Sequence, residues 1–264
     1  MTASAVEPSA MNAPLTVRET QAKSVLNKSK IHDYCVNAYT GCQVACRYCY
    51  ARLFIPRYSG HAEPWGAFVD AKVNAPDVLR KQLLRAKRGT VWVSSVCDCY
   101  QPLEAKYRLT RRCLEELAAV QFPVSVQTKS ALALRDLDVF GRFRELDVTF
   151  TITTDDERTA RLFEPLASPV AERIQALETL HRAGIRTSVF IGPILPGDPA
   201  ALVAALEGKV DEALIDRLNY ADTVRRFYEG ANLGAALEDD FFSRMTAAYV
   251  RELRKRQIQY RVVC

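Results

Sequence analysis

The sequence lacks the features that would place the protein in a membrane or outside the cell. No apolar run approaches the ~20 residues that a membrane-spanning helix needs. The amino terminus has no basic region followed by an apolar stretch, so a signal peptide is not expected. Eight cysteines without an export signal indicate a reducing compartment, where thiols bind metals or take part in catalysis more often than they form disulfides. We therefore predict a cytoplasmic protein with no membrane partner.

The sequence also has few histidines and a small net charge. Only three histidines occur, and their positions have no metal-binding spacing. The formal net charge of +5 is modest for 264 residues. Basic residues gather at 80–88 and 251–261, but a solvated helix face explains such a cluster at least as well as a nucleic-acid-binding surface does. The charge pattern therefore permits a nucleic-acid partner without requiring one.

Length and composition predict one folded domain. A chain of 264 residues can bury a sizeable core, and no internal repeat or linker divides this one. Residues 1–25 are rich in Ala, Ser, Thr and Pro and show no sustained periodicity. We therefore predict a flexible amino-terminal tail over residues 1–25 and a single domain over residues 26–264.

Short β-branched runs alternate with amphipathic helical stretches after residue 25. Strands are predicted at 90–96, 123–128, 147–153, 186–191 and 258–263, with weaker signals at 34–37 and 213–218. Helices are predicted at 76–86, 110–120, 135–144, 170–183, 199–206 and 239–256. Because short connections join the alternating elements, the strands should be parallel with right-handed crossovers. The pattern fits an α/β fold of the partial (β/α)6 TIM-type barrel class, whose chemistry gathers at the carboxyl ends of the strands.

Three cysteines, Cys42, Cys46 and Cys49, lie within eight residues. Three thiolates can hold three irons of a 4Fe–4S cluster, and with no fourth ligand nearby one iron stays free to bind something else. Zinc is an alternative because Cys-x2-Cys is also zinc spacing, although no second such pair or His pair follows at finger or ribbon spacing. Buried structural cysteines are the other alternative.

The cysteine motif and several further segments resemble a known enzyme family. Cys-x3-Cys-x2-Cys with aromatic residues around its last cysteine is the signature of the radical S-adenosylmethionine (SAM) enzymes. The chain is similar to their branch around spore photoproduct lyase, often described as DNA repair photolyase-like proteins. The matching segments, in the family's order, are NAYTGC at 37–42, KVNAP at 72–76, DCYQPLE at 98–104, LTR at 109–111, TKS at 128–130, RD at 135–136, EP at 164–165 and PILPG at 193–197. They are specific for the branch but not for a substrate.

The resemblance implies two cofactors, a 4Fe–4S cluster and SAM, on a partial barrel. Members cleave SAM reductively to methionine and a 5′-deoxyadenosyl radical, which abstracts hydrogen from the substrate. The electron would come from a reductant such as flavodoxin or ferredoxin. Repair of a DNA pyrimidine photoproduct is the nearest named activity, and radical modification of RNA, a peptide or a small metabolite is an alternative. A non-catalytic iron–sulfur sensor of iron or redox state, and a zinc-dependent hydrolase, are the other hypotheses.

The resemblance also implies SAM-binding residues near the strand ends. Lys129, followed by Ser130 in the Thr-Lys-Ser motif, would pair with the methionyl carboxylate, as the corresponding lysine does in the spore photoproduct lyase group. Thr151 or Thr153 would replace a serine of the family as a carboxylate or ribose partner. Threonines are also common in strands for packing reasons alone, so both interpretations stay open.

An adenine site is expected beside the cysteine loop. Tyr48, between two of the cysteines, would pack against the adenine ring. Backbone groups of Pro193 and Ile194 would face its edge. Arg173 could instead serve structure by forming an ion pair with Glu164, and we favour that interpretation.

Residues 96–102 depart from the family pattern, because Cys97 and Cys99 stand where many relatives have Thr and Pro. Spore photoproduct lyase has a hydrogen-donating cysteine in this region, at a position that corresponds to Ser95. Residues 95 and 97 point the same way on a strand, so Cys97 could still reach the site. A weak S–H bond suits Cys97 to hydrogen-atom donation.

Two other hypotheses exist for the cysteines outside the triad. Cys97 and Cys99 could hold an auxiliary cluster together with Cys35 or Cys113. All of them could instead be buried free thiols, which behave as small hydrophobic side chains. Cys264, at the last position, is left unassigned.

Three residues that follow Cys99 are candidates for a substrate pocket. Tyr100, Gln101 and Glu104 are predicted to lie at the barrel mouth. Tyr100 could pass on a radical or stack on a base. Aromatic residues are equally common in packing, and the sequence does not separate the two roles.

Overall fold

The computed structural model describes residues 14–263 of the chain. Its main sheet has eight strands in the order β11-β10-β9-β8-β7-β6-β3-β2. These are β2 (Leu26–Lys28), β3 (Tyr34–Val36), β6 (Val91–Val93), β7 (Val124–Thr128), β8 (Leu146–Thr151), β9 (Arg186–Ile191), β10 (Glu212–Ile215) and β11 (Gln259–Val262). Neighbours from β3 to β11 are parallel, whereas β2 joins β3 antiparallel at one edge. The predicted partial TIM-type barrel is confirmed.

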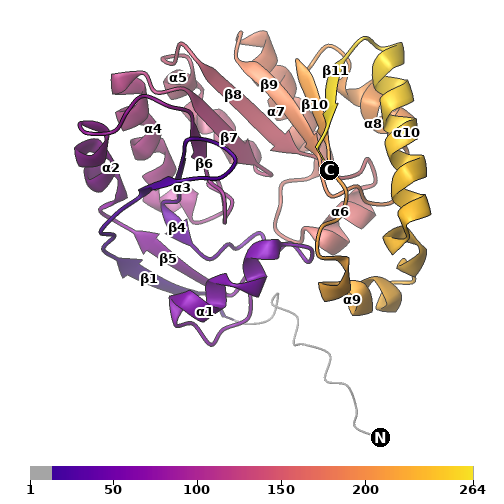
Figure 1. Ribbon diagram of the computed structural model, residues 1–264, viewed down its shortest axis with the longest axis horizontal. Coiled ribbons are helices and arrows are strands. Elements are labelled where there is room, and N and C mark those ends of the chain that lie inside the picture. The colour runs from indigo at the N-terminus through magenta and orange to yellow at the C-terminus, as the bar shows by residue number, and fades with distance from the viewer. Residues whose placement is uncertain (1–13, 264) are drawn as a thin grey trace, which may run out of the picture.

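Helices connect successive strands and cover the outside of the sheet. The longer ones are α2 (Ala75–Leu83), α4 (Leu109–Val120), α7 (Val170–Arg182), α8 (Pro199–Leu206) and α10 (Asp239–Lys255). The shorter ones are α1 (Ile55–Ser59), α3 (Glu104–Tyr107), α5 (Leu137–Phe140), α6 (Glu157–Phe163) and α9 (Arg225–Gly230). Figure 1 shows the strands as an open arc, with α2 and α4 outside one end and α8 and α10 outside the other. No helix within residues 14–263 is long and apolar enough to cross a membrane.

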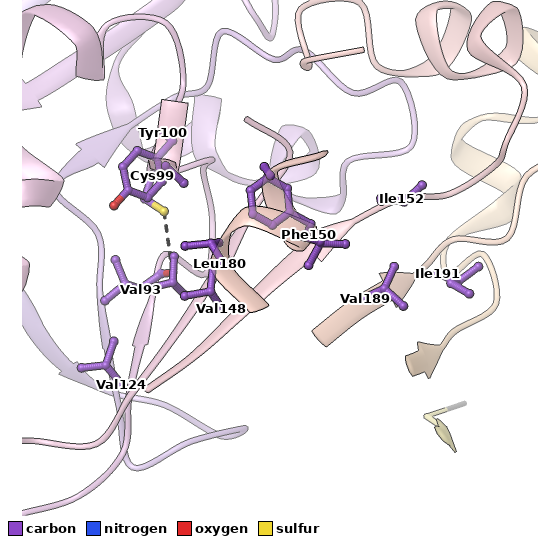
Figure 2. Packing of buried hydrophobic residues seen from close by; sticks show 14 of the residues in the cluster. Val93, Cys99, Tyr100, Val124, Val148, Phe150, Ile152, Leu180, Val189 and Ile191 are labelled. Carbon is purple, nitrogen blue, oxygen red and sulfur yellow. Dashed lines mark hydrogen bonds between the residues drawn. The ribbon is translucent and has the colours of Figure 1, made fainter. Parts of the chain in front are cut away.

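Successive residues of the central strands point to opposite faces of the sheet, one apolar and the other largely polar. On β8 and β9 the side chains of Val148, Phe150, Val189 and Ile191 point outward and belong to one hydrophobic core. Figure 2 shows these residues together with Leu180 of α7, which packs against the sheet from outside. This outer layer holds the strands in place and leaves their other face free to surround a cavity.

A second, three-stranded sheet lies beside the barrel near α1 (Figure 1). β1 (Thr16–Thr20) pairs parallel with β5 (Phe68–Lys72), and β4 (Tyr39–Thr40) pairs antiparallel with β5. The predicted tail over residues 1–25 is therefore wrong at Thr16–Thr20, while its residues 1–13 lie outside the described part. The partner of β1 is distant in sequence, so no local pattern predicts this strand.

The predicted helix over 135–144 is confirmed only at Leu137–Phe140. Ala131–Asp136 forms a 3-10 turn, which is followed only by the single-turn helix α5. The side chain of Arg135 donates to Glu104 and to Asp136, both fully buried. A tertiary ion-pair network therefore overrides the local helical pattern in this segment.

Candidate active site

A cavity of about 1670 Å³ lies inside the barrel. Its wall is the inward face of the strands, and Trp92, Gln127, Thr149, Ser188 and Leu214 line it from β6, β7, β8, β9 and β10. Bulky branched side chains fill the interior of a complete TIM barrel, whereas several of the lining side chains here are short and polar. The interior is consequently hollow and offers hydrogen bonds to a ligand.

The three predicted cluster ligands meet at one end of this cavity. Cys42 and Cys46 are 6% and 8% exposed, and Cys49 is half-buried. All three line the cavity and share a small apolar cluster with Val44 and Ala167. The loop that carries them comes after the barrel strand β3, with the short strand β4 of the second sheet in between, so it lies at the carboxyl end of the barrel, where chemistry gathers in such folds.

Gln101 braces the beginning of the cysteine loop. Its Oε1 accepts from the Gln43 amide at 2.9 Å, and its Nε2 donates to the Gly41 carbonyl at 3.4 Å. In return, Gln43 Oε1 accepts from the Leu103 amide at 2.7 Å. Gln101 is fully buried and outside the cavity wall. Its predicted contact with substrate is therefore not supported, and it acts on the loop instead.

Burial keeps the thiols of the triad protonated when no metal is bound. Burial, followed by the charge of Asp98, raises the pKa of Cys42 well above its usual value. Burial also raises the pKa of Cys46 to about 12 and shifts the pKa of Cys49 upward. Thiolates are the species that bind iron, so these thiols need a cationic centre to ionise. The residues present fit a metal centre that supplies this charge.

The triad can be compared with the site of a single metal ion and with that of a cluster. Within residues 14–263, no three His, Cys, Asp or Glu side chains converge as the ligands of one metal ion do. Zinc requires such convergence, with each sulfur about 2.3 Å from the same ion. In a cubane cluster each thiolate binds a different iron, so the sulfurs stay further apart. Among the described residues, the three thiols as they stand therefore do not form a single-ion site.

Asp98 connects the cysteine loop to the end of β7. Its Oδ2 accepts from the Lys129 amide at 2.7 Å, and its Oδ1 accepts from Thr128 Oγ1 at 2.6 Å. The Asp98 amide donates to Cys42 Sγ at 3.3 Å. Asp98 thus contacts a predicted cluster ligand through its backbone amide and the backbone of the predicted SAM-binding lysine through its carboxylate.

Lys129 and Tyr48 form a pair at the cysteine end of the cavity. Both line it, and Lys129 Nζ lies 5.7 Å from the centroid of the Tyr48 ring. Burial lowers the pKa of Lys129, but the nearby Cys46, Glu164 and Asp98 outweigh burial and hold this pKa above its usual value. The cavity therefore contains a charged ammonium that is suited to a carboxylate ligand.

The buried ion pair between Arg173 and Glu164 is confirmed, at 2.5 Å. Glu164 also accepts from the Tyr48 hydroxyl and, at 3.2 Å, from Thr153 Oγ1. Thr153 is buried outside the cavity wall, so its predicted role toward SAM is not supported. Thr151 does line the cavity, where its Oγ1 accepts from Gln127 Nε2 at 3.2 Å.

Two more predicted SAM contacts have structural roles instead. Ser130 Oγ accepts from the Leu132 amide at 3.3 Å and caps the 3-10 turn that follows. Ile194 is 1% exposed, and its amide donates to the Asp216 carbonyl at 3.1 Å. Neither residue lines the cavity, whereas Pro193 does. Only Pro193 of these three is placed to meet a ligand.

Cys97, the predicted hydrogen donor, lies in the cavity wall beside the cysteine triad. It packs against the apolar cluster of the triad. Its Sγ is 2.9 Å from Ser94 Oγ and 3.7 Å from the Tyr39 carbonyl oxygen. Burial, as the largest influence, raises the pKa of Cys97 to about 11, so the S–H bond is retained at neutral pH.

The other cysteines do not assemble around Cys97. Cys99 is 2% exposed in the core, and its Sγ lies 3.8 Å from the Val93 carbonyl oxygen (Figure 2). Cys113 is fully buried on α4 in the same core. Cys35, half-buried on β3, lies 3.7 Å from Asn37 Nδ2. These positions do not support an auxiliary cluster, and Cys264 lies outside the described residues.

Tyr100 and Glu104 belong to the core and not to the barrel mouth. Tyr100 is fully buried, and its hydroxyl donates to Asp136 Oδ2 at 3.1 Å. Figure 2 shows its ring among the hydrophobic side chains. Glu104 is equally buried and accepts from Arg135 at 2.9 Å. The predicted role of Tyr100 in radical transfer or base stacking is therefore not supported.

Three residues that the sequence reasoning missed lie at the site. Gln127 lines the cavity, and the alternation of Val124 and Val126 with polar residues on β7 could have revealed it. Tyr50 is 40% exposed at the cavity rim, and its hydroxyl donates to the Ser95 carbonyl. Trp65 packs against the cysteine cluster from a segment without periodicity, so no sequence signal marks it.

A hollow parallel barrel with three loop cysteines and a buried lysine at its carboxyl end defines an iron–sulfur enzyme of the radical SAM class. The family model described as the Radical SAM superfamily matches residues 36–206. The chain belongs to this superfamily, whose members use a 4Fe–4S cluster and SAM. The predicted family and cofactors are confirmed.

Similar proteins include both uncharacterized and named ones. An uncharacterized protein of Methanocaldococcus jannaschii is 37% identical over 188 residues, which is 70% of each chain. The radical SAM Nalpha-GlyT isomerase of Pseudomonas phage M6 is 23% identical over 157 residues, which cover 59% of this chain and 32% of the phage protein. A spore photoproduct lyase variant with bound AdoMet and dinucleoside spore photoproduct superposes with a TM-score of 0.69 at 17% identity, covering 94% and 81% of the two chains. This last likeness concerns the fold.

Proposed function

We propose that the protein reductively cleaves SAM and performs hydrogen abstraction on a substrate held in the barrel cavity. The observation that carries this proposal is that Cys42, Cys46, Cys49 and Lys129 line one end of a hollow barrel. When bound there, the cluster would pass one electron to SAM, whose cleavage would give methionine and a 5′-deoxyadenosyl radical. An electron donor of the flavodoxin or ferredoxin type is the proposed partner.

The residues around the cavity have defined tasks in this proposal. The three cysteines hold three irons, and the Lys129 ammonium pairs with the methionyl carboxylate. The Tyr48 ring, whose hydroxyl is tied to Glu164, packs against adenine. The hollow interior holds the substrate close to the cofactor, as hydrogen abstraction requires.

Cys97 is the proposed hydrogen donor. It lines the cavity beside the cysteine cluster, and its raised pKa keeps the thiol protonated. The weak S–H bond can therefore return a hydrogen atom to a substrate radical. If Cys97→Ala leaves the product yield and the deuterium pattern of the product unchanged, this role is wrong.

The substrate that we propose is a DNA pyrimidine photoproduct. The support is the ordered set of motifs shared with the spore photoproduct lyase branch, together with the common fold. A second candidate is radical modification of RNA, a peptide or a small metabolite. It is favoured by the hydrogen-bonding interior around Gln127, Thr149 and Ser188, and by the relative named as an isomerase.

The decisive experiment measures SAM cleavage by the anaerobically reconstituted, reduced protein. We expect about four irons per chain, as one cubane requires, and formation of 5′-deoxyadenosine detected by mass spectrometry. Cys46→Ala serves as the control and should form none. Fully loaded protein that forms no 5′-deoxyadenosine would instead support a non-catalytic sensor.

A second measurement separates the two substrate candidates. Oligonucleotides irradiated to contain thymine photoproducts are incubated with the active protein and analysed by mass spectrometry. Conversion of the photoproduct back to thymines supports repair. Vigorous SAM cleavage with the photoproduct left intact would exclude repair and favour the second candidate.

A further inference from the structure

The indole of Trp65 lies against the cysteine loop from a different part of the chain. It packs onto the apolar cluster that contains Cys42 and Cys46. Its ring makes an edge contact with Phe68 of β5, with 6.0 Å between the ring centroids and an interplanar angle of 80°. Phe68 is fully buried, so this contact limits how the indole can turn. The position of Trp65 beside the cysteine loop is therefore fixed by packing.

The Nε1 atom of Trp65 is buried and has no hydrogen-bond partner within residues 14–263. Buried N–H groups almost always have a partner, because an unsatisfied donor loses the hydrogen bonds that it makes to water. Arg47 Nε, in the cysteine loop, is unsatisfied too, but its guanidinium stacks over the Phe227 ring at 5.4 Å. Trp65 packs on the cysteine loop but does not line the cavity, so the cysteine sulfurs of the loop, and not sulfides inside the cavity, are the acceptors available to its N–H group.

A 4Fe–4S cluster supplies the kind of acceptor that this donor lacks. Both the sulfides of a cubane and its cysteine sulfurs accept N–H hydrogen bonds. The amide of Asp98 already donates to Cys42 Sγ at 3.3 Å, so one such bond is present in the structure. We propose that the indole N–H of Trp65 donates a hydrogen bond to a cysteine sulfur of the cluster.

Such a bond would tune the cluster as well as hold it. A hydrogen bond to sulfur stabilises the reduced cluster, which carries more negative charge, and thereby raises the reduction potential. Trp65 would make electron acceptance easier before SAM cleavage. This role concerns the cofactor and is independent of which substrate the cavity holds.

The chain provides its own control, because Trp65 and Trp92 are its only tryptophans. Trp92 is on β6, where it lines the cavity and contacts the ring of His32 at 5.7 Å. Full-length protein is labelled with ¹⁵N-indole tryptophan, reconstituted, reduced and examined by pulsed EPR. We expect a ¹⁵N coupling to the cluster in the wild type and in Trp92→Phe, and its loss in Trp65→Phe. Absence of the coupling in Trp92→Phe, where Trp65 alone remains, would overturn the proposal.

The reduction potential provides a second readout. Trp65→Phe keeps the aromatic ring and removes only the N–H donor, so its cluster should have a more negative midpoint potential than the wild type. Trp92→Phe should have the wild-type potential. An unchanged potential in Trp65→Phe with full iron content would contradict the proposal. If Trp65→Phe does not take up the cluster, the labelled Trp92→Phe protein still decides the question.

These outcomes are separable from those of the proposed function. Protein that forms 5′-deoxyadenosine but shows no indole coupling would retain the proposed function and refute the role of Trp65. Protein that shows the coupling but forms no 5′-deoxyadenosine would support the role of Trp65 and refute the proposed function.

Discussion

The two faces of the barrel strands differ in chemistry at every second residue. On β8, Val148 and Phe150 face the helices and belong to the hydrophobic core, whereas Thr149 and Thr151 line the cavity. Apolar burial on the outer face provides most of the stabilisation, because that face meets a layer of helices. The inner face is thereby free to carry polar groups for ligands. Function and stability are therefore separable here within a single strand.

Two cysteines that are two residues apart show the same contrast between the cavity and the core. Cys97 lines the cavity beside the cluster ligands, while Cys99 is 2% exposed in the core. The chain turns between them after β6, so the period-two rule of a strand no longer applies. Position relative to the cavity, and not residue type, decides which thiol can take part in chemistry.

Removing a cysteine at the cavity should have the largest effect. Cys46→Ala removes one of three thiolates, so we expect loss of the cluster and 5′-deoxyadenosine formation at background level. Cys99→Ala on the core side should retain the full iron content. Iron and sulfide analysis together with product quantification tests both variants. Equal iron loss in the two variants would break the distinction between the cavity and core cysteines.

Truncating a side chain on the outer face should reduce stability the most. Phe150 is fully buried, so Phe150→Ala should lower the free energy of unfolding by about 3–5 kcal/mol. Thr149→Val on the inner face removes one hydrogen bond, to Asp147 at 2.8 Å, and should cost about 1 kcal/mol. Urea unfolding measures both. Similar losses would show that the two faces contribute equally to stability.

Removing the charge inside the cavity should affect binding and not folding. Lys129→Met should weaken SAM binding by about 10- to 150-fold, because a charge-assisted hydrogen bond contributes about 1.5–3 kcal/mol. Lys81→Met, on the exposed part of α2, is the matched control and should leave binding unchanged. Calorimetric titration of the reconstituted protein with SAM measures the affinity of each variant. Unaltered affinity in Lys129→Met would remove Lys129 from the proposed SAM site.

The smallest expected effect is a shift in the pH dependence of alkylation. Because burial raises the pKa of Cys97 to about 11, its reactive thiolate should accumulate only as the pH approaches that value. Below pH 9, the protonated thiol should react with iodoacetamide more slowly than a cysteine in an unfolded peptide does. Mass spectrometry of the Cys97 peptide from the cluster-free protein follows the reaction. Rapid alkylation at pH 8 would place Cys97 in a more open environment than the structure shows.

The features that could be predicted from the sequence depend on the spacing of residues close together in the chain. Three cysteines within eight residues can reach one inorganic centre whatever the rest of the chain does, so the cluster site could be inferred from the motif. The alternation of strands and helices likewise predicts a parallel barrel, because short connections leave few other topologies.

Contacts between distant segments decided the rest. Tyr100 is in the core because Asp136, which accepts from its hydroxyl, comes from the segment after β7. β1 exists because β5 pairs with it, and Trp65 reaches the cysteines because the chain returns along that sheet. Burial and hydrogen-bond partners belong to the packed molecule, since free energy depends on which groups meet after folding. The sequence by itself therefore determined the chemistry of the site, and the tertiary structure decided which neighbouring side chains face it.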